Sequence, residues 1–294
     1  MSKYDIKFYK EEFLESHEKV GKEATKDWSG FGQTSAEQLK QLYSQEGFDP
    51  DTKLYAFKGD NLVGFLTSSI LPEDESGVKV ANLEFPLTLA EHGDCAELLF
   101  NKAVETLKKK GVSKLQTRVG EPYKGTIEKA KKWGYTYSSD LYVLIEADVK
   151  KLKLKESDIK ILDFDINRDL EDMVKIFMEL GTTEEYARAN FDRVSKDKEN
   201  FPVHLIIRED DKVVGRVMAY RNPNTPNEFN FGNLYYIDEK YFEPLLSTAL
   251  DKIKALDAKI ASLFLYGPTL ADEDKYISFG FSRVAKIDYY EKEI

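Results

Sequence analysis

The sequence predicts an α+β protein made of two copies of one unit, each with a central mixed, mostly antiparallel sheet flanked by helices. Short words recur in the same order in both halves: "GDNLVGFLTSS" is similar to "DDKVVGRVMAY", "ANLEFPL" to "GNLYYID", and "KKWGYTY" to "ISFGFSR". Gly64 then aligns with Gly215. Gly120 aligns with Gly267 at a slightly smaller offset. A shared order at nearly constant spacing indicates a duplication.

The domain boundary is predicted in the charged, glycine-free stretch "KKLKLKES" at residues 150–157. This stretch has the composition of a linker. We therefore expect a first domain at residues 1–149 and a second at residues 158–294. A chain of 294 residues is long enough for two domains.

The first copy can be divided into elements by its apolar periodicity and its turn residues. The turn at Gly59-Asp60-Asn61 predicts a β-hairpin, because two alternating runs flank it. The helix after Cys95 has apolar residues at helical spacing and ends in the cations and glycine of "KKKG". The other expected elements are a strand at 6–9, helical regions at 12–27 and 35–44, a long strand at 78–85, a strand at 114–119, a short helix at 126–133 and a last strand at 141–149.

Composition excludes several classes of protein. The formal net charge of −10 and a pI near 5.1 argue against a general nucleic-acid binder. No stretch is apolar enough to span a membrane, and the amino-terminal residues lack the apolar region of a secretory signal. One cysteine and three scattered histidines provide neither a disulfide framework nor a zinc spacing. We therefore expect a cytoplasmic protein without a metal.

The loop "AEHGDC" precedes the helix that follows Cys95, and it has the position of a phosphate-binding loop. The start of a helix presents unpaired N–H groups and a partial positive charge, which attract a diphosphate. A glycine at residue 93 would let a ligand approach the backbone closely. An ordinary turn with Asp94 as the helix N-cap is the alternative reading.

This order of elements, with a glycine loop before a helix and "WGY" or "FGF" after a later helix, resembles the GNAT superfamily of acyl-CoA-dependent N-acetyltransferases. The resemblance covers nearly the whole chain, as two GNAT units in tandem. It implies a V-shaped split between two central strands, where the pantetheine of acetyl-CoA lies like an added strand. It also implies that the pyrophosphate of acetyl-CoA binds the loop before the helix.

Matched to the family motif "[QR]xxGx[GA]", the loop fits at Gly93 and departs from it elsewhere. Ala90 replaces the first polar residue, and Cys95 stands where glycine or alanine is expected. Glu91 and Asp94 place negative charge beside a bound dianion. The resemblance assigns cofactor binding to Phe85, Leu87, His92, Gly93, Asp94, Cys95 and Ala96.

The second copy has no glycine loop. No glycine separates the word "GNLYYID" from Gly267, and Lys240 and Phe242 stand opposite Gly93 and Cys95. We therefore expect this half to be a degenerate GNAT-like domain.

Acetyl transfer to an amine needs a base for the ammonium proton and an acid for the departing thiolate. The resemblance assigns the base to Glu84, in "NLEFP". A carboxylate that merely faces solvent from the strand is the alternative. The tyrosine that commonly serves as acid is replaced by Ala130 in the first copy and is present as Tyr276 in the second. A packing role is the alternative for Tyr276.

The sequence thus predicts an acetyl-CoA-dependent N-acetyltransferase that acts on the amine of a small molecule or a peptide, as a monomer or homodimer. Acetyl-CoA would be its co-substrate, and nucleic acids and membranes are not expected partners. A non-catalytic pseudo-acetyltransferase that binds a metabolite or a protein partner is the alternative.

Overall fold

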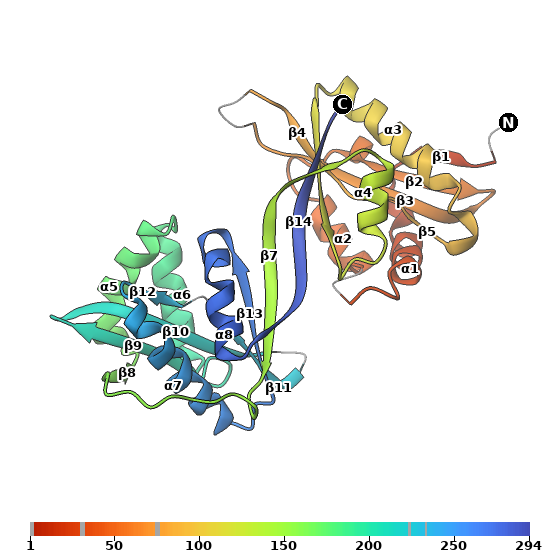
Figure 1. The fold of residues 1–294 in the computed structure, drawn as a ribbon. Coiled ribbons are helices and arrows are strands. Elements are labelled where there is room, and N and C mark those ends of the chain that lie inside the picture. Colours follow the sequence, from red (N-terminus) through yellow and green to blue (C-terminus); the bar gives the residue numbers. More distant parts are fainter. Residues whose placement is uncertain (1–2, 30–32, 74–76, 223–224, 233) are drawn as a thin grey trace. The chain divides into compact units, whose positions relative to one another are not determined.

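The computed structural model describes residues 3–29, 33–73, 77–222, 225–232 and 234–294 (Figure 1). Asn233, in one of the repeated words, lies outside the described residues. The chain forms two compact units. The first unit contains residues 1–141 and 286–294, and the second contains residues 142–285. Each repeats the same order of strands and helices, which confirms the predicted α+β class.

The first unit has a sheet of order β1-β2-β3-β4-β6-β14-β7, and β5 also pairs with β3. Its helices are α1 (Leu14–Ala24), α2 (Ala36–Tyr43), α3 (Cys95–Lys109) and α4 (Thr126–Lys132). Its strands are β1 (Asp5–Phe8), β2 (Lys53–Lys58), β3 (Asn61–Ile70), β4 (Val80–Leu83), β5 (Leu87–Thr88), β6 (Lys114–Gly120), the start of β7 (Thr136–Asp148) and the end of β14 (Ser282–Glu293). Only the β4–β6 pair is parallel among the pairings described for this unit.

The two faces of this sheet carry separate cores, because successive side chains of a strand point to opposite faces. On β2, Leu54 and Ala56 pack with α3, whereas Tyr55 and Phe57 pack with Phe13 and the α1 side. Helix α3 therefore covers one face of the β1–β3 sheet and α1 the other (Figure 1). The α1 face is the one that carries the candidate site.

The second unit repeats this arrangement with the order β7-β13-β11-β10-β9-β8, and β12 pairs with β10. Its further strands are β8 (Ile161–Asp163), β9 (Val203–Glu209), β10 (Lys212–Asn222), β11 (Thr225–Phe231), β12 (Tyr235–Tyr236) and β13 (Ile260–Tyr266). Its helices are α5 (Ile166–Glu179), α6 (Glu184–Lys196), α7 (Phe242–Lys254) and α8 (Glu273–Phe279). The β11–β13 pair is parallel, as β4–β6 is in the first unit.

The two long strands β7 and β14, drawn side by side in Figure 1, each serve both units. Residues 142–148 of β7 pair with β13 in the second unit, where Val143 and Ile145 join the core. In return, Ile287–Glu293 of β14 pair with β6 in the first unit, where Tyr290 packs on the core. The end of the last strand of each sequence repeat thus pairs with strands of the other repeat.

The structure divides the chain differently from the linker suggested by residues 150–157. Leu152 is buried in the core of the second unit, and Lys155 makes an ion pair of 2.7 Å with Glu243 on α7. This charged stretch is therefore packed against the second unit. The apolar residues of its alternating pattern, such as Leu152, explain why this stretch is packed and is not a flexible linker.

The predicted long strand at 78–85 is wrong in one respect that matters for the site. Strand β4 ends at Leu83, and pairing with β3 resumes only at Leu87 in β5. Pro86 has no N–H to donate to a ladder, so a continuous strand through this point is disfavoured. Glu84 and Phe85 therefore lie in an irregular segment between two short strands.

None of the helices that the structure describes has the length and apolarity needed to cross a bilayer.

Gly120 allows β14 to join the first unit. A Cβ added at Gly120 would lie 2.4 Å from both the carbonyl oxygen of Lys286 and Cδ1 of Ile287. We expect Gly120→Ala to lower the free energy of unfolding by about 1–3 kcal/mol, because the backbone of β14 must move. Urea unfolding measures this loss. Gly93→Ala is the matched control, since a Cβ there meets nothing within 4 Å, and equal stability of the two variants would contradict the assignment.

His17 on α1 is a buried histidine in the α1-side core. The centroid of its ring lies 3.8 Å from that of Phe65, with the two rings tilted by 37°, and its Nδ1 lies 3.1 Å from the hydroxyl of Tyr55. Burial lowers the pKa of His17 to about 4 from its usual 6.5. The unfolded chain therefore takes up the proton first as pH falls, and stability is lost between pH 6.5 and 4.

We expect His17→Gln to reduce this acid sensitivity by up to about 3 kcal/mol between these pH values. The measurement is the unfolding free energy of both proteins at several pH values between 4 and 7. Other titrating groups, including the buried His204 of the second unit, contribute equally to both proteins and cancel in the difference. Parallel pH profiles would contradict a neutral, buried His17.

Candidate functional site

The candidate site begins where the parallel pairing of β4 with β6 ends. Only Val80, Ala81 and Asn82 pair with β6, and the register stops at Gln116. Beyond this point a cavity of about 290 Å³ lies between the segment at Glu84–Leu87 and the end of β6. The sheet of the first unit is thus split between two central strands.

This first cavity is lined by both aromatic and polar side chains. Its lining residues are His17, Trp28, Gln33, Thr34, Leu39, Tyr43, Phe65, Thr67, Glu84, Phe85, Leu87, Arg118, Tyr123 and Thr126. Trp28 and Tyr123 meet edge to face, with ring centroids 5.1 Å apart. The cavity therefore combines an apolar wall with the charged pair of Glu84 and Arg118.

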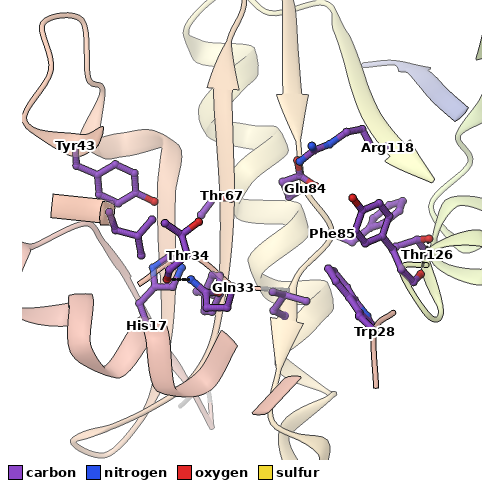
Figure 2. A pocket seen from close by; sticks show the side chains of 14 residues that line it. His17, Trp28, Gln33, Thr34, Tyr43, Thr67, Glu84, Phe85, Arg118 and Thr126 are labelled. Atoms are coloured by element: carbon purple, nitrogen blue, oxygen red, sulfur yellow. Dashed lines mark hydrogen bonds and ion pairs between the residues drawn. The ribbon is translucent and has the colours of Figure 1, made fainter. Parts of the chain in front are cut away.

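Glu84 and Arg118 form an ion pair at one side of this cavity (Figure 2). Nη2 of Arg118 donates to Oε1 of Glu84 over 2.6 Å, and the Glu84 carboxylate raises the pKa of Arg118. Within the described part of the chain, Oε2 of Glu84 has no hydrogen-bond partner. The carboxylate is thus oriented by one oxygen and open at the other.

The same pair borders a second cavity of about 320 Å³, lined by Lys53, Thr67, Ser68, Ser69, Asn82, Glu84, Thr117, Arg118 and Tyr289. Several of these residues form a row across four strands. Lys53 is opposite Thr67, whose carbonyl accepts from the N–H of Glu84, and Arg118 is opposite Tyr289. We call Lys53, Thr67, Glu84, Arg118 and Tyr289 the polar row.

Lys53 is the most buried charge of the polar row. Its side chain is only 8% exposed, Nζ donates to the carbonyl of Ser68, and the ring of Tyr43 lies 5.6 Å from Nζ. Burial lowers the pKa of Lys53 to about 8. No carboxylate in the described ranges lies within 4 Å of this ammonium group, so its charge is uncompensated by an ion pair.

The predicted phosphate loop leads into α3. Gly93 is exposed and helical in conformation, with φ of −58°, and a Cβ built on it meets nothing within 4 Å. The glycine is therefore not required by the packing of the chain itself. An unneeded glycine in front of a helix leaves room for a ligand to approach the backbone.

Asp94 does not cap α3 with its side chain, contrary to the ordinary-turn reading. Its carboxylate instead accepts from the hydroxyl of Tyr4 at 2.5 Å and from Nζ of Lys3 at 2.8 Å. The hydrogen bond from Lys3 is the main cause that lowers the pKa of Asp94. The negative charge that would repel a diphosphate is thus balanced by Lys3 from a distant part of the sequence.

The other residues assigned to the loop have different surroundings. Cys95 is fully buried, and burial raises the pKa of its thiol to about 11, so its side chain is a packing group. His92 is half-buried, with Nδ1 at 3.1 Å from the Tyr4 hydroxyl. Ala96 lies in the first turn of α3, and its N–H donates to the carbonyl of Gly93.

Tyr276 lies in the second unit, where its side chain is 2% exposed in the core between Phe242 and Phe281. Burial raises the pKa of its hydroxyl. The structure therefore places this tyrosine in a packing environment, whereas Glu84, Phe85 and Leu87 line the first cavity of the first unit.

The second unit has no acidic residue in the stretch that corresponds to the segment of Glu84. Gly64 pairs with Thr88 in the first unit, and its counterpart Gly215 pairs with Tyr236 in the second. The stretch from Gly215 to Tyr236 is shorter, and no acidic residue occurs in it between Phe231 and Tyr236. The second unit thus has no equivalent of the Glu84–Arg118 pair.

Sequence reasoning missed Arg118 and Lys53. Arg118 is the only arginine in residues 1–149, in a half where all other cations are lysine, and that was an available signal. Lys53 has no such signal, because lysine is frequent in this chain. Among the described residues, no cluster of histidine, cysteine and carboxylate side chains could hold a metal ion.

No family model matches this sequence, and no curated protein matches it. Solved structures do resemble it. A GCN5-related N-acetyltransferase from Sphaerobacter thermophilus has a TM-score of 0.65 at 11% identity, covering 100% of this chain and 96% of that chain. A tandem GNAT protein from the clavulanic acid biosynthesis pathway has a TM-score of 0.62 at 12% identity, covering 99% and 98%. A GNAT-family acetyltransferase from Colwellia psychrerythraea has a TM-score of 0.58 at 14% identity, covering 98% and 100%.

At these identities the likeness establishes the fold and leaves the activity to be argued from the site. It confirms the fold expected from the sequence, including the expected duplication. The chain therefore has the fold of the GCN5-related N-acetyltransferases, with two such units in tandem.

Proposed function

We propose that the first unit transfers an acyl group, most simply acetyl from acetyl-CoA, to an amine of a small molecule or a peptide. The observation that carries this proposal is the Glu84–Arg118 pair at the point where β4 and β6 separate. It supports the proposal because a carboxylate with one free oxygen lies beside a cavity that opens between two strands.

The acyl donor would lie along the irregular segment at residues 84–87. In the described chain no backbone hydrogen bond joins this segment to β6, although the N–H of Glu84 donates to Thr67 and the carbonyl of Pro86 accepts from Nζ of Lys129. The remaining peptide groups would be available to a ligand that adds like a strand. The start of α3 would receive the pyrophosphate at Gly93, where Lys3 already balances the charge of Asp94.

Glu84 would act as the base. A protonated amine must lose a proton before its nitrogen attacks the thioester carbonyl, and the free oxygen of Glu84 can accept that proton directly or through one water. The amine nitrogen then bonds to the carbonyl carbon, and the carbon–sulfur bond breaks to release the thiolate. Arg118 would keep the carboxylate oriented.

Tyr123 is the hydroxyl group that would be available to the departing thiolate in this arrangement. It lines the first cavity, whereas Tyr276 belongs to the core of the other unit. The second unit would then serve as a scaffold, since it lacks a counterpart of Glu84.

Acyl-CoA binding is tested by Gly93→Leu. Because the position is open, we expect this variant to keep the melting temperature of the parent chain and to lose the stabilisation given by acetyl-CoA. At a hundredfold excess over Kd, bound ligand stabilises a protein by about 2.7 kcal/mol, which a thermal-shift assay detects.

Lys240→Leu is the matched control, since Lys240 stands at the corresponding place in the second unit. It should retain the full acetyl-CoA shift. Retention of the shift by Gly93→Leu, or its loss in Lys240→Leu alone, would place the acyl donor elsewhere and contradict the proposal.

The role of Glu84 is tested by Glu84→Gln, which keeps shape and removes the base. With an accepted amine and acetyl-CoA, we expect kcat to fall roughly 100-fold or more, with acetyl-CoA binding retained. Release of coenzyme A can be followed with a thiol reagent, because Cys95 is the only cysteine and is buried.

The control is Glu128→Gln, an exposed carboxylate on α4. It should leave kcat unchanged. A Glu84→Gln variant as active as the control would reduce Glu84 to a partner of Arg118 without a catalytic role.

A further inference from the structure

The second cavity contains more positive than negative charge. Two cations, Lys53 and Arg118, line it, and Glu84 is the one carboxylate among the lining side chains in the described chain. Burying a cation without a counter-charge is costly, so buried charges are normally paired. The cavity is thus short of one negative charge.

Lys53 is the cation of this cavity that has no counter-charge within 4 Å among the described residues. This residue is buried, and its ammonium donates to a neutral carbonyl, that of Ser68. The nearest acidic influences are Asp49 and Glu84, and Asp49 is engaged at 2.8 Å by Lys110. The pKa of Lys53, lowered to about 8 by burial, still leaves the group mostly charged at pH 7.

The remaining lining groups suit an anion with directional acceptors. Thr67, Ser69, Asn82 and Tyr289 line the cavity and carry hydroxyl or amide groups that can donate. A volume of about 320 Å³ is at the lower end of the range for small-molecule sites. One surplus positive charge matches a carboxylate better than a phosphate dianion.

We propose that the second cavity binds a carboxylate, and that the acceptor of the acyl group is an amine that carries one. The acceptor's carboxylate would lie between Lys53 and Arg118, and its ammonium would face Glu84, which borders both cavities. The class of substrate is then an amino acid or another small amino carboxylate. This assignment of the acceptor rests on the proposed function, whereas carboxylate binding does not.

Carboxylate binding is measured first, without acetyl-CoA. Thermal shifts and calorimetry are recorded with glycine, β-alanine, 4-aminobutyrate, glutamate and phenylalanine, with the matching amines that lack the carboxylate, and with inorganic phosphate. We expect one or more amino carboxylates to bind at least tenfold more tightly than their amine analogues. Equal binding of the amines, or binding of phosphate alone, would overturn the proposal.

Lys53→Met then tests the residue. Because it removes an uncompensated buried charge, we expect an unchanged or higher melting temperature together with at least tenfold weaker carboxylate binding. Lys58→Met, at the exposed end of the same strand, is the control and should bind as the parent does. A Lys53→Met variant that loses stability and keeps carboxylate affinity would show that Lys53 only supports the carbonyl of Ser68.

Asn82→Asp provides a second test of the carboxylate site, and this variant leaves Lys53 unchanged. It adds a carboxylate to the cavity lining at nearly constant shape, and it should weaken carboxylate binding by a similar factor. Full binding by this variant would contradict the charge argument, even if Lys53→Met were to misfold.

Acetyl transfer is measured last, on the same panel. Transfer to amines with and without a carboxylate at equal kcat/KM would overturn the acceptor class and leave the proposed function standing. Carboxylate binding that depends on Lys53, in a protein that shows no acetyl-CoA shift, would overturn the proposed function and leave the carboxylate site standing.

Discussion

The loss of strand pairing after Asn82 is the constraint on which the candidate site depends. Pro86 cannot donate to a ladder, and the register with β3 resumes only at Leu87, so among the described pairings β6 has no partner strand on its β4 side beyond Gln116. Arg118 would otherwise lie against a paired strand, where the ion pair with Glu84 would border no cavity. The cavity, the oriented carboxylate and the open peptide groups all follow from this one interruption.

The sequence predicted the fold class and the duplication, because these depend on periodic apolar residues and on glycines that recur along the chain. It did not predict where β4 ends, since a run such as "VKVANLEF" reads as one strand unless the partner strands are known. It also missed the row from Lys53 to Arg118. Those residues are far apart in sequence, and only the register of four strands brings them together.

The two units have diverged at corresponding places. Register places Lys53 opposite Thr67 in the first unit and His204 opposite Met218 in the second. His204 accepts from Nε of the buried Arg216, whose guanidinium lies over the ring of Phe177. The second unit therefore has a buried histidine–arginine pair beside aromatic rings at the place where the first unit has Lys53 and Thr67. Such divergence is expected after a duplication, when only one copy must keep its chemistry.

Because β7 and β14 each pair with strands of the other sequence repeat, the order of synthesis limits the order in which the two units can fold. Strand β6 can pair with Ile287–Glu293 only after these residues leave the ribosome, and they are synthesised after the whole second unit. The amino-terminal half, usually the first to fold during translation, here finishes last. Until then, the edge of β6 that pairs with β14 has no partner strand, and an unpaired strand edge is a site of aggregation.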